Sequence, residues 1–271
     1  MEYYYPKSST LKKHIRYISF YASDEKEKEY LVFPNHGAAM VLGANLHFQP
    51  LSKNTFLSKE SPGEYRNTLH VNRIDPVKII EQGHQEKITI VFEPLGLNHF
   101  IYEPLSEFLD HSSLNNYNIE QSQRFPNFAK QVFGCHTFEQ KLECIENYLL
   151  QRYIPFQAPF LADALPLLMD MDESYTVGEI AKSLFTNPRS LLRLFQKHIC
   201  LSPVEFRNIF QFRYSLGRKI ESGIASFKEI SYESNYSDAS YMVRMYKKFT
   251  GLKPSQFFEQ VATDKYVIIS L

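Results

Sequence analysis

Short runs of aromatic and β-branched residues, separated by turn residues, fill about the first 110 positions of the chain. Runs of this length between turn signals are typical of β-strands. The predicted strands are 15–21, 29–33, 38–42, 66–74 and 87–92. The predicted turns are Asp24-Glu25, 34–37, 61–63 and 82–84. Short strands at this spacing predict a small β-sandwich or β-barrel.

Beyond Thr137 the apolar residues recur at helical spacing. Thr137 has the form of an N-cap, and the helix after it carries a heptad-like apolar seam. The seam residues are Phe138, Leu142, Ile145 and Leu149. The seam is either a dimer interface or the face that packs on the chain's own β-rich part. A second short apolar helix is predicted at 160–171.

The C-terminal third of the chain contains an internal repeat. The string TVGEIAKSLFTNPRSLLRLFQK, which begins at Thr176, is followed about fifty residues later by a related string. Residues 179–181 align with 229–231, and after one inserted residue Arg193 aligns with Arg244. Each copy predicts a helix, a short turn, a second helix and an exit that contains proline. We interpret the copies as two helix-turn-helix units.

Each copy opens with the signature of a capping box, Thr176 with Glu179 and Ser226 with Glu229. In this motif the hydroxyl oxygen and the carboxylate satisfy two amides that would otherwise lack acceptors at the start of a helix. The first helix of each unit is therefore predicted to begin directly after the threonine or the serine.

The second helix of the first unit is predicted to begin at Pro188, because Asn187 is a favourable N-cap and proline fits the first helical position. Its buried stripe is Leu191, Leu194 and Phe195. Between the two copies, residues 206–220 are apolar at helical spacing. They predict one continuous linker helix that fixes the distance between the units.

The charge is distributed unevenly along the chain. The whole chain has a formal net charge of zero, but residues 176–258 contain thirteen basic and six acidic residues, a net charge of +7. The remainder must then carry −7. This asymmetry indicates that only the C-terminal part meets nucleic acid.

The two copies of the repeat and the helix between them resemble the C-terminal DNA-binding domain of the AraC/XylS family of bacterial transcription regulators. The strings that carry the resemblance are EIAKSLFTNPRSLLRLFQKHICLSP, RYSLGRKI and EISYESNYSDASYMVRMYKKFTGLKPSQF, within residues 174–260. The chain departs from the family pattern at several positions. No glycine stands near Cys200, Gly217 replaces an alanine, Asn235-Tyr236 replaces glycine-phenylalanine, and Leu192 and Ala239 stand where glutamine is common.

The resemblance implies a role for individual residues of both second helices. The implied base-reading residues are Arg189, Leu192, Arg193 and Gln196 in the first unit and Ala239, Ser240, Tyr241 and Arg244 in the second. The residues expected to contact phosphate are Thr176, Lys197, Ser226, Lys247 and Lys248. Without the glutamine, Leu192 is expected to make at most an apolar contact with a thymine methyl group.

A weaker resemblance concerns the β-rich part. The string KITIVFEPLGL, which begins at Lys87, is similar to the end of the cupin-like sensor domain of AraC-type regulators, where a strand gives way to a helix near Pro94. In the family such a domain binds a small effector or mediates dimerisation. The resemblance implies this architecture and no particular ligand.

The sequence gives little support for enzymatic or metal chemistry. The six histidines of the β-rich part form neither a His-x-His nor a His-x-x-x-His pair, and catalytic and phosphate-loop motifs are absent from the sequence. We expect no enzyme activity, no cofactor and no metal. Two alternatives to a DNA-binding regulator stay open. One is a ligand-binding or interaction module whose helices no longer bind DNA, and the other is a metal-dependent cupin-type enzyme fused to a DNA-binding domain.

The location and the partners follow from the composition. Cys135, Cys144 and Cys200 are odd in number and lack metal-ligand spacing, which is typical of free thiols in a reducing compartment. Neither a signal peptide nor a membrane-length apolar run is present, so we expect a soluble, cytoplasmic protein. Double-stranded DNA is the expected partner. A small-molecule effector, RNA polymerase and a second copy of the chain are candidate partners, and no membrane is expected.

The predicted fold class is α+β. A small, cupin-like β-barrel or sandwich with helices precedes an all-α domain of two helix-turn-helix units and a linker helix. The expected boundaries are 1–134 for the β-rich domain, 135–171 for a helical linker, 172–260 for the DNA-binding domain and 261–271 for an apolar, strand-like tail.

Overall fold

The computed structural model describes residues 2–23, 26–108, 116–118, 127–222, 226–260 and 268–270. The chain divides into two compact units. The first comprises Met1–Lys28, Gly37–Val71 and Ile79–Gln157, and the second comprises Glu29–His36, Asn72–Lys78 and Ala158–Leu271. The predicted turn Asp24-Glu25 lies outside the described residues.

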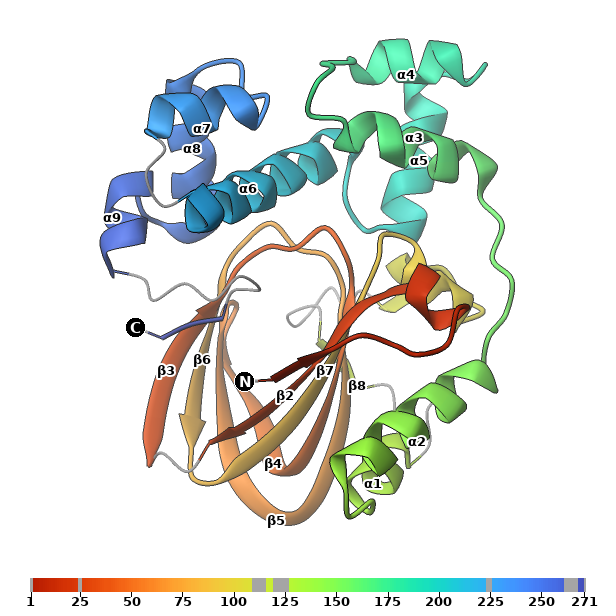
Figure 1. The fold of residues 1–271 in the computed structure, drawn as a ribbon, viewed down its shortest axis with the longest axis vertical. Coiled ribbons are helices and arrows are strands. Elements are labelled where there is room, and N and C mark those ends of the chain that lie inside the picture. The colour runs from red at the N-terminus through yellow and green to blue at the C-terminus, as the bar shows by residue number, and fades with distance from the viewer. Residues whose placement is uncertain are drawn as a thin grey trace. The chain divides into compact units, whose positions relative to one another are not determined.

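A curled antiparallel sheet forms most of the first unit (Figure 1). Its strands are β1 (Glu2–Tyr4), β2 (Ile15–Ser23), β4 (Ala39–Ser52), β5 (Thr55–His70), β6 (Val77–Gln82), β7 (Gln85–Phe92) and β8 (Asn116–Asn118). The strand order is β1-β2-β7-β4-β5-β6, with β8 beside β5. In the register of the central strands, Val41 lies opposite Thr68 on one side and Thr89 on the other. The predicted β-rich fold is confirmed as a half-barrel.

The β4–β5 hairpin is longer than predicted, and the predicted turn at 61–63 is wrong. The chain reverses at Lys53-Asn54, and β5 continues through residues 61–63. A register shift opposite this segment explains the misleading signal. At the shift Asn45 adopts a left-handed φ of 55°, and its Oδ1 accepts a hydrogen bond of 2.9 Å from the Gly63 amide. Gly63 itself has a φ of 80°, so the glycine serves a bulge and not a turn.

Helices of the first unit pack beside its sheet. They are the 3₁₀ helices η1 (Leu11–Lys13), η2 (Gly96–His99) and η3 (Leu105–Phe108), and the α-helices α1 (Phe128–Phe133) and α2 (Phe138–Leu150). The helix predicted near Pro94 is the short η2, which follows Leu95 in a left-handed conformation with a φ of 63°. The N-cap predicted at Thr137 is present, and it forms part of a capping box with Gln140.

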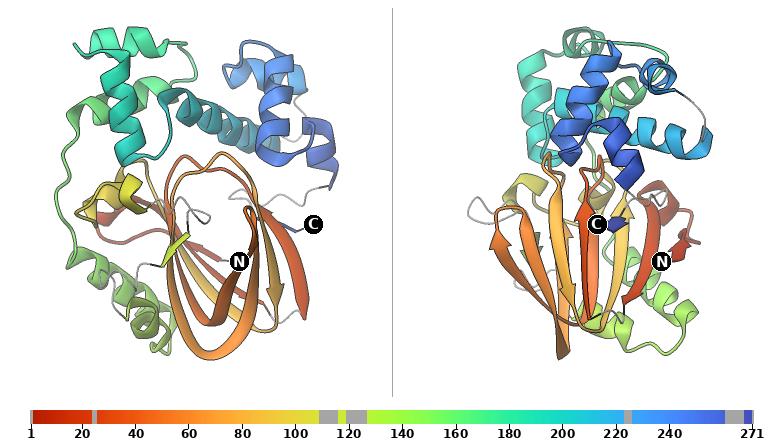
Figure 2. Two further views of the ribbon diagram at one scale, coloured as in Figure 1. Left: turned by 180° about the vertical axis from the view of Figure 1, so that it is seen from behind. Right: turned by 90° about the vertical axis from the view of Figure 1, so that its left-hand side faces the viewer.

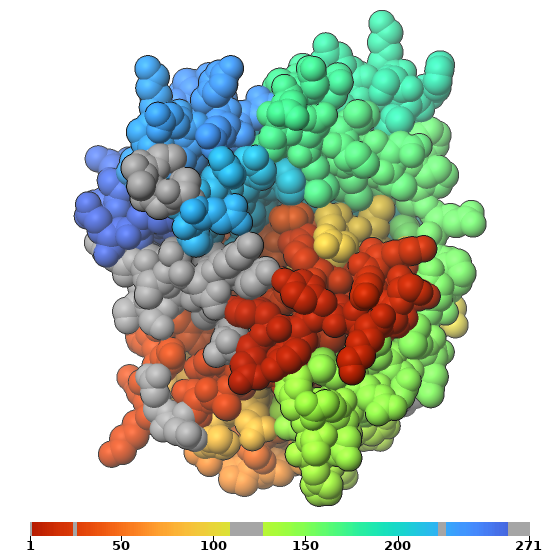
Figure 3. Space-filling view, viewed as in Figure 1, coloured from red at the N-terminus to blue at the C-terminus, as the bar shows by residue number. Residues whose placement is uncertain are grey.

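The apolar seam of α2 packs on its own unit. The Phe138 ring lies 4.0 Å from that of Tyr4 and 4.2 Å from that of Phe20, measured between centroids. Ile145 and Leu149 are fully buried. Figure 3 shows the red N-terminal segment against the yellow-green segment that contains α2. Of the two interpretations of the seam, the structure favours intramolecular packing.

The second unit is mainly helical. Its elements are β3 (Glu27–Val32), α3 (Pro159–Met169), α4 (Val177–Ser183), α5 (Pro188–His198), α6 (Pro203–Ser222), α7 (Phe227–Glu233), α8 (Ala239–Thr250), α9 (Pro254–Gln260) and β9 (Ile268–Ser270). The long helix α6 runs from the α4–α5 pair to the α7–α8 pair (Figures 1 and 2), which confirms the predicted linker helix. The strand β9 pairs antiparallel with β3, with Ile269 opposite Leu31. The remainder of the predicted apolar tail lies outside the described residues.

Aromatic side chains form the core of the second unit. The Phe206 ring of α6 lies edge-on to Phe195 of α5 at 5.9 Å, and the Phe212 ring meets Tyr246 of α8 at 5.0 Å. Burial of each such side chain is worth roughly 1.5–3 kcal/mol. The linker helix is thus the common apolar support of both helix-turn-helix units. No helix in the described ranges combines the length and the apolarity needed to cross a bilayer.

Candidate nucleic-acid interface

The two helix-turn-helix units begin with the same hydrogen bonds. Thr176 Oγ1 accepts from the Glu179 amide at 3.2 Å, and the Glu179 carboxylate accepts from the Thr176 amide at 2.8 Å. Ser226 and Glu229 repeat both distances. Both predicted capping boxes are confirmed. Each places a carboxylate at the N-terminus of its helix, where a phosphate would otherwise bind, so these two positions are weaker candidates for phosphate contact than the lysines.

The second helices of the two units are also capped at equivalent positions. Asn187 Oδ1 accepts from the Ser190 amide at 2.9 Å, and Asp238 Oδ1 accepts from the Tyr241 amide at 2.7 Å. Arg193 and Arg244 each lie six residues after their cap. The side chains eight residues after the caps are both buried aromatic rings. The alignment of the two arginines, inferred from the repeat, therefore holds in three dimensions.

The helices end in the same conformation as well. Cys200 follows α5 with a φ of 62°, and Gly251 follows α8 with a φ of 80°. A left-handed residue after a helix is usually glycine, because a side chain is strained there. The first helix-turn-helix unit thus has a cysteine at the position where the second helix-turn-helix unit has glycine. Burial raises the pKa of the Cys200 thiol to about 12.

Most of the predicted site residues lie on accessible faces. The exposed base-reading candidates are Arg189, Arg193, Gln196, Ala239, Ser240 and Arg244, and the half-buried ones are Leu192 and Tyr241. All five phosphate candidates are exposed: Thr176, Lys197, Ser226, Lys247 and Lys248. The helices α5 and α8 therefore each present a basic, accessible face with one arginine in an equivalent place.

The basic residues of α6 are engaged within the second unit. Arg213 donates from Nε to the Pro34 carbonyl at 2.6 Å and from Nη2 to the Phe33 carbonyl at 2.8 Å. Arg207 donates to the Tyr175 carbonyl. Arg218 and Glu233 pair on the surface. Compared with α6, the helices α5 and α8 therefore have more positive charge available to a ligand.

Sequence reasoning missed a polar stripe along α6. Tyr241 donates its hydroxyl to Asn208 Oδ1 at 3.0 Å, and Gln211 Nε2 donates to the Asn235 carbonyl at 2.6 Å. Ser215 Oγ lies 3.0 Å from the Tyr246 hydroxyl. The three α6 residues share one helical face because they are spaced three and four apart. That spacing within an apolar helix was the available signal, but it does not reveal the partners.

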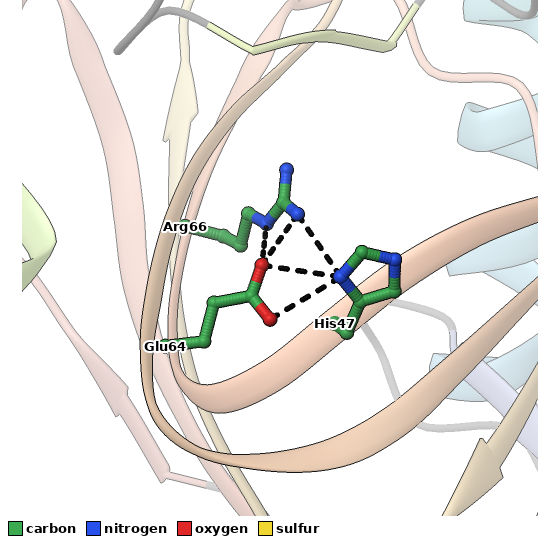
Figure 4. A network of polar contacts seen from close by, with 3 residues as sticks. All are labelled: His47, Glu64 and Arg66. Atoms are coloured by element: carbon green, nitrogen blue, oxygen red, sulfur yellow. Dashed lines mark hydrogen bonds and ion pairs between the residues drawn. The ribbon is translucent and has the colours of Figure 1, made fainter.

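Three histidines of the first unit, His14, His47 and His99, lie in two small clusters. Figure 4 shows His47 Nδ1 between the Glu64 carboxylate, at 3.1 and 3.2 Å, and Arg66 Nη2, at 3.1 Å. Desolvation raises the pKa of Glu64, but hydrogen bonds from His47 and Arg66 outweigh it and lower the pKa overall. In the described ranges no group of three or more histidine, cysteine, aspartate or glutamate side chains is arranged to hold a metal ion.

The second cluster is a stack of rings. His14 and His99 lie 3.9 Å apart between ring centroids, and Tyr153 stacks on His99 at 5.5 Å. His99 Nδ1 accepts from the Phe156 amide at 3.2 Å. Desolvation, followed by the charges of His99 and Lys13, lowers the pKa of His14 to about 4. Desolvation also lowers the pKa of His99, so burial in the stack favours the neutral form of both rings.

Comparison with known proteins identifies the second unit. A family model described as a helix-turn-helix domain matches residues 180–260, the range that contains both equivalent arginines. The second unit therefore contains an AraC-type helix-turn-helix domain. With this domain, the chain is a DNA-binding transcription regulator.

Solved structures extend the likeness beyond the AraC/XylS domain. ToxT from Vibrio cholerae is 14% identical in sequence and has a TM-score of 0.52, over 93% of this chain and 100% of that one. A structure of ToxT from strain SCE256 with an unsaturated fatty acid bound is 13% identical, with a TM-score of 0.47 over 90% of this chain and 94% of that one. A DNA-binding transcriptional dual regulator from Escherichia coli K-12 is 17% identical, with a TM-score of 0.33 over 39% of this chain and 94% of that one. The first comparison shows that this chain shares its fold with ToxT. A search of curated proteins finds no match.

Proposed function

We propose that the chain is a sequence-specific regulator that reads two successive major grooves with α5 and α8. The observation that carries this proposal is the equivalence of Arg193 and Arg244, which are exposed at the same distance from the caps of two basic helices. Arginine binds guanine O6 and N7 with two hydrogen bonds, the commonest specific contact in the major groove. Successive grooves on one face of DNA are about 34 Å apart.

Selection from a random-sequence duplex library tests this proposal. The parent should enrich two half-sites with centres about 10 base pairs apart. Arg193→Ala should lose the preference at one half-site and Arg244→Ala at the other, each at a cost of about 1–3 kcal/mol. A single half-site that both variants still prefer would contradict reading by two helices. If the parent protein bound all library sequences equally, the result would favour the alternative of a ligand-binding or interaction module whose helices no longer read DNA sequence.

Phosphate contacts are proposed for the exposed lysines of the two reading helices, Lys197, Lys247 and Lys248. These ammonium groups supply affinity without sequence information, because they release counterions from DNA regardless of base sequence. The base-reading roles of Arg189, Gln196 and Ser240 rest on their exposure beside the two arginines. Leu192 and Ala239 can contribute only apolar contact with a base or a sugar.

We infer that the first unit responds to a small effector. The inference is supported by the division into two compact units and by the charge asymmetry, because a net charge of −7 outside residues 176–258 does not favour contact with DNA. A ligand screen that follows both the thermal stability of the protein and its affinity for a selected operator tests this. A ligand should shift both quantities. If no ligand changes DNA affinity, dimerisation stays as the role of this unit.

Two macromolecular partners, a second copy of the chain and RNA polymerase, are also proposed. The burial of Ile145 and Leu149 means that a dimer would have to use a surface other than the α2 seam. Sedimentation with and without operator DNA tests the dimer, and transcription from a promoter that carries the operator tests the effect on polymerase.

A further inference from the structure

The hydroxyl group of Tyr241 in α8 is engaged within the protein and is not free to contact DNA. The residue lies at the third position of the helix, is half-buried, and donates its hydroxyl to Asn208 Oδ1 of α6 at 3.0 Å. The ring also packs near that of Tyr236, with centroids 6.1 Å apart. A hydroxyl held in this way does not offer its proton to a base edge, in contrast to the base-reading role that the family resemblance implies for Tyr241.

The face of the Tyr241 ring meets the guanidinium group of Arg244. The Arg244 Cζ atom lies 5.2 Å from the ring centroid, within the range in which a cation is attracted to an aromatic face. Asp238, the N-cap of the same helix, also interacts with Arg244 through its charge. The amide of Tyr241, and more weakly the charge of Arg244, lower the pKa of the Asp238 carboxyl. Arg244 is therefore attracted by both a ring and a carboxylate of its own helix.

The first helix-turn-helix unit has no counterpart of this arrangement. Ser190 stands in the place of Tyr241 and neutral Asn187 in the place of Asp238. Within the described part of the chain, Arg193 makes no hydrogen bond, ion pair or ring contact. Arg193 must lose its side-chain freedom when it binds a base, whereas Arg244 has lost part of that freedom before DNA arrives.

The support beneath Tyr241 is itself fixed. Two further hydrogen bonds start from the same face of α6. Gln211 donates to the Asn235 carbonyl in the turn between α7 and α8, and Ser215 bonds with Tyr246 of α8. Directional hydrogen bonds of this kind define one geometry between two helices more strictly than apolar contacts do. The position of the Tyr241 ring is thus set by α6, and through the ring so is that of Arg244.

We propose that Tyr241 is a positioning residue that holds Arg244 ready to read its base, with Asn208 as the anchor of Tyr241. This inference rests on the proposed reading of DNA by α8. An exposed cation–π contact corresponds to about a two- to fivefold effect on binding. The second helix-turn-helix unit accordingly discriminates among bases more sharply than the first helix-turn-helix unit.

A double-mutant cycle tests the inference. The protein is the full chain, and the probes are an operator selected from a random library and the same duplex with the base pair read by Arg244 replaced. Tyr241→Leu should reduce the ratio of the two affinities by about two- to fivefold in the parent. In an Arg244→Ala background it should have no further effect, because there is no guanidinium group left to position. Ser190→Ala, at the equivalent position of the first helix-turn-helix unit, is the matched control. It should leave the ratio of the two affinities unchanged in both the parent and the Arg244→Ala background.

Conservative variants separate positioning from a general structural defect. Tyr241→Phe and Asn208→Ala both remove the anchor and keep a ring, so each should give the same smaller loss, and their combination should lose no more than either. Affinity for non-specific duplex and its salt dependence should stay at the parent value in every Tyr241 and Asn208 variant. If Tyr241→Leu lowers the helix content, the cycle is run with Tyr241→Phe.

The outcomes distinguish the inference from the function beneath it. Additive losses in the cycle would overturn the inference, since they would mean that Tyr241 contacts the DNA itself. A loss of non-specific affinity equal to the loss of specific affinity would also overturn it, in favour of a purely structural role. If the parent enriches no sequence at all, the proposed DNA reading fails, and with it the premise of the cycle.

Discussion

Removal of one charge from the interior of the β-rich unit should be more costly than any surface change in this protein. Lys87 of β7 donates its ammonium group to Glu81 of β6, and the two side chains are only 9% and 1% exposed. Tyr21 of β2, directly opposite Lys87, donates its hydroxyl to the same carboxylate at 2.6 Å. Burial lowers the pKa of Lys87, because water no longer solvates the ammonium ion, and the charge of Glu81 opposes this effect.

The substitution Lys87→Met keeps the length of the side chain and leaves the Glu81 carboxylate buried without its counter-ion. Breaking a buried pair in this way costs about 3–5 kcal/mol, out of a total of about 5–15 kcal/mol for an ordinary domain. The double variant Lys87→Met/Glu81→Gln should recover most of the loss. Its neutral amide carries no charge to desolvate and still offers an oxygen to Tyr21.

Hydrogen exchange measures this loss in the unit concerned. Peptides from β2 and β7 should exchange about 2 to 3.5 orders of magnitude faster in Lys87→Met, since each 1.4 kcal/mol is a tenfold change. Peptides from α5 and α8, in the other unit, should keep the parent rates. Lys141→Met, which breaks a more exposed pair of 3.7 Å with Glu86, is the control and should cost less than about 1 kcal/mol. A double variant as unstable as the single one would refute the reasoning.

Three further predictions concern the ends of helices, the histidine stack and the phosphate contacts. Gly251→Ala should destabilise the second unit by about 1 kcal/mol in urea unfolding, because alanine is strained at a φ of 80°; an unchanged midpoint would show that this strain is absent. The pKa of His14 lies below its unfolded value of 6.5, so the folded protein binds fewer protons and loses stability as the pH falls from 6.5 towards 4. His14→Phe should flatten this slope in thermal unfolding, and an equal slope in both proteins would contradict it. Lys247→Ala should weaken binding to all duplexes alike and lower the salt slope by about one; a loss confined to the operator would argue against a phosphate contact.

The helical elements of the second unit could be predicted because their signals are local. A capping box or an asparagine-proline pair fixes the start of a helix within four residues, so α4, α5 and α7 begin where the sequence indicates. The turn at 61–63 was misassigned for the opposite reason. Its glycine is explained by a bulge at Asn45, eighteen residues away, which only the pairing of β4 and β5 reveals.

Residue roles were harder to predict than elements. The equivalence of Arg193 and Arg244 follows from the repeat, but the role of Tyr241 depends on Asn208, thirty-three residues away on another helix. Arg213 is one of the thirteen basic residues of the C-terminal part, and the sequence does not reveal that it donates to two backbone carbonyls in a segment nearly 180 residues earlier. Side chains whose partners are distant in the chain cannot be assigned from spacing alone.

The central claim is that Arg193 and Arg244 read base sequence while the surrounding lysines bind phosphate. It is tested most directly by retention of genomic fragments from the source organism on the parent and on an Arg193→Ala/Arg244→Ala variant, at two salt concentrations. The account predicts that a few fragments survive the higher salt with the parent and are lost with the variant, while both proteins retain DNA unselectively at low salt. Equal enrichment of the same fragments by both proteins would contradict it.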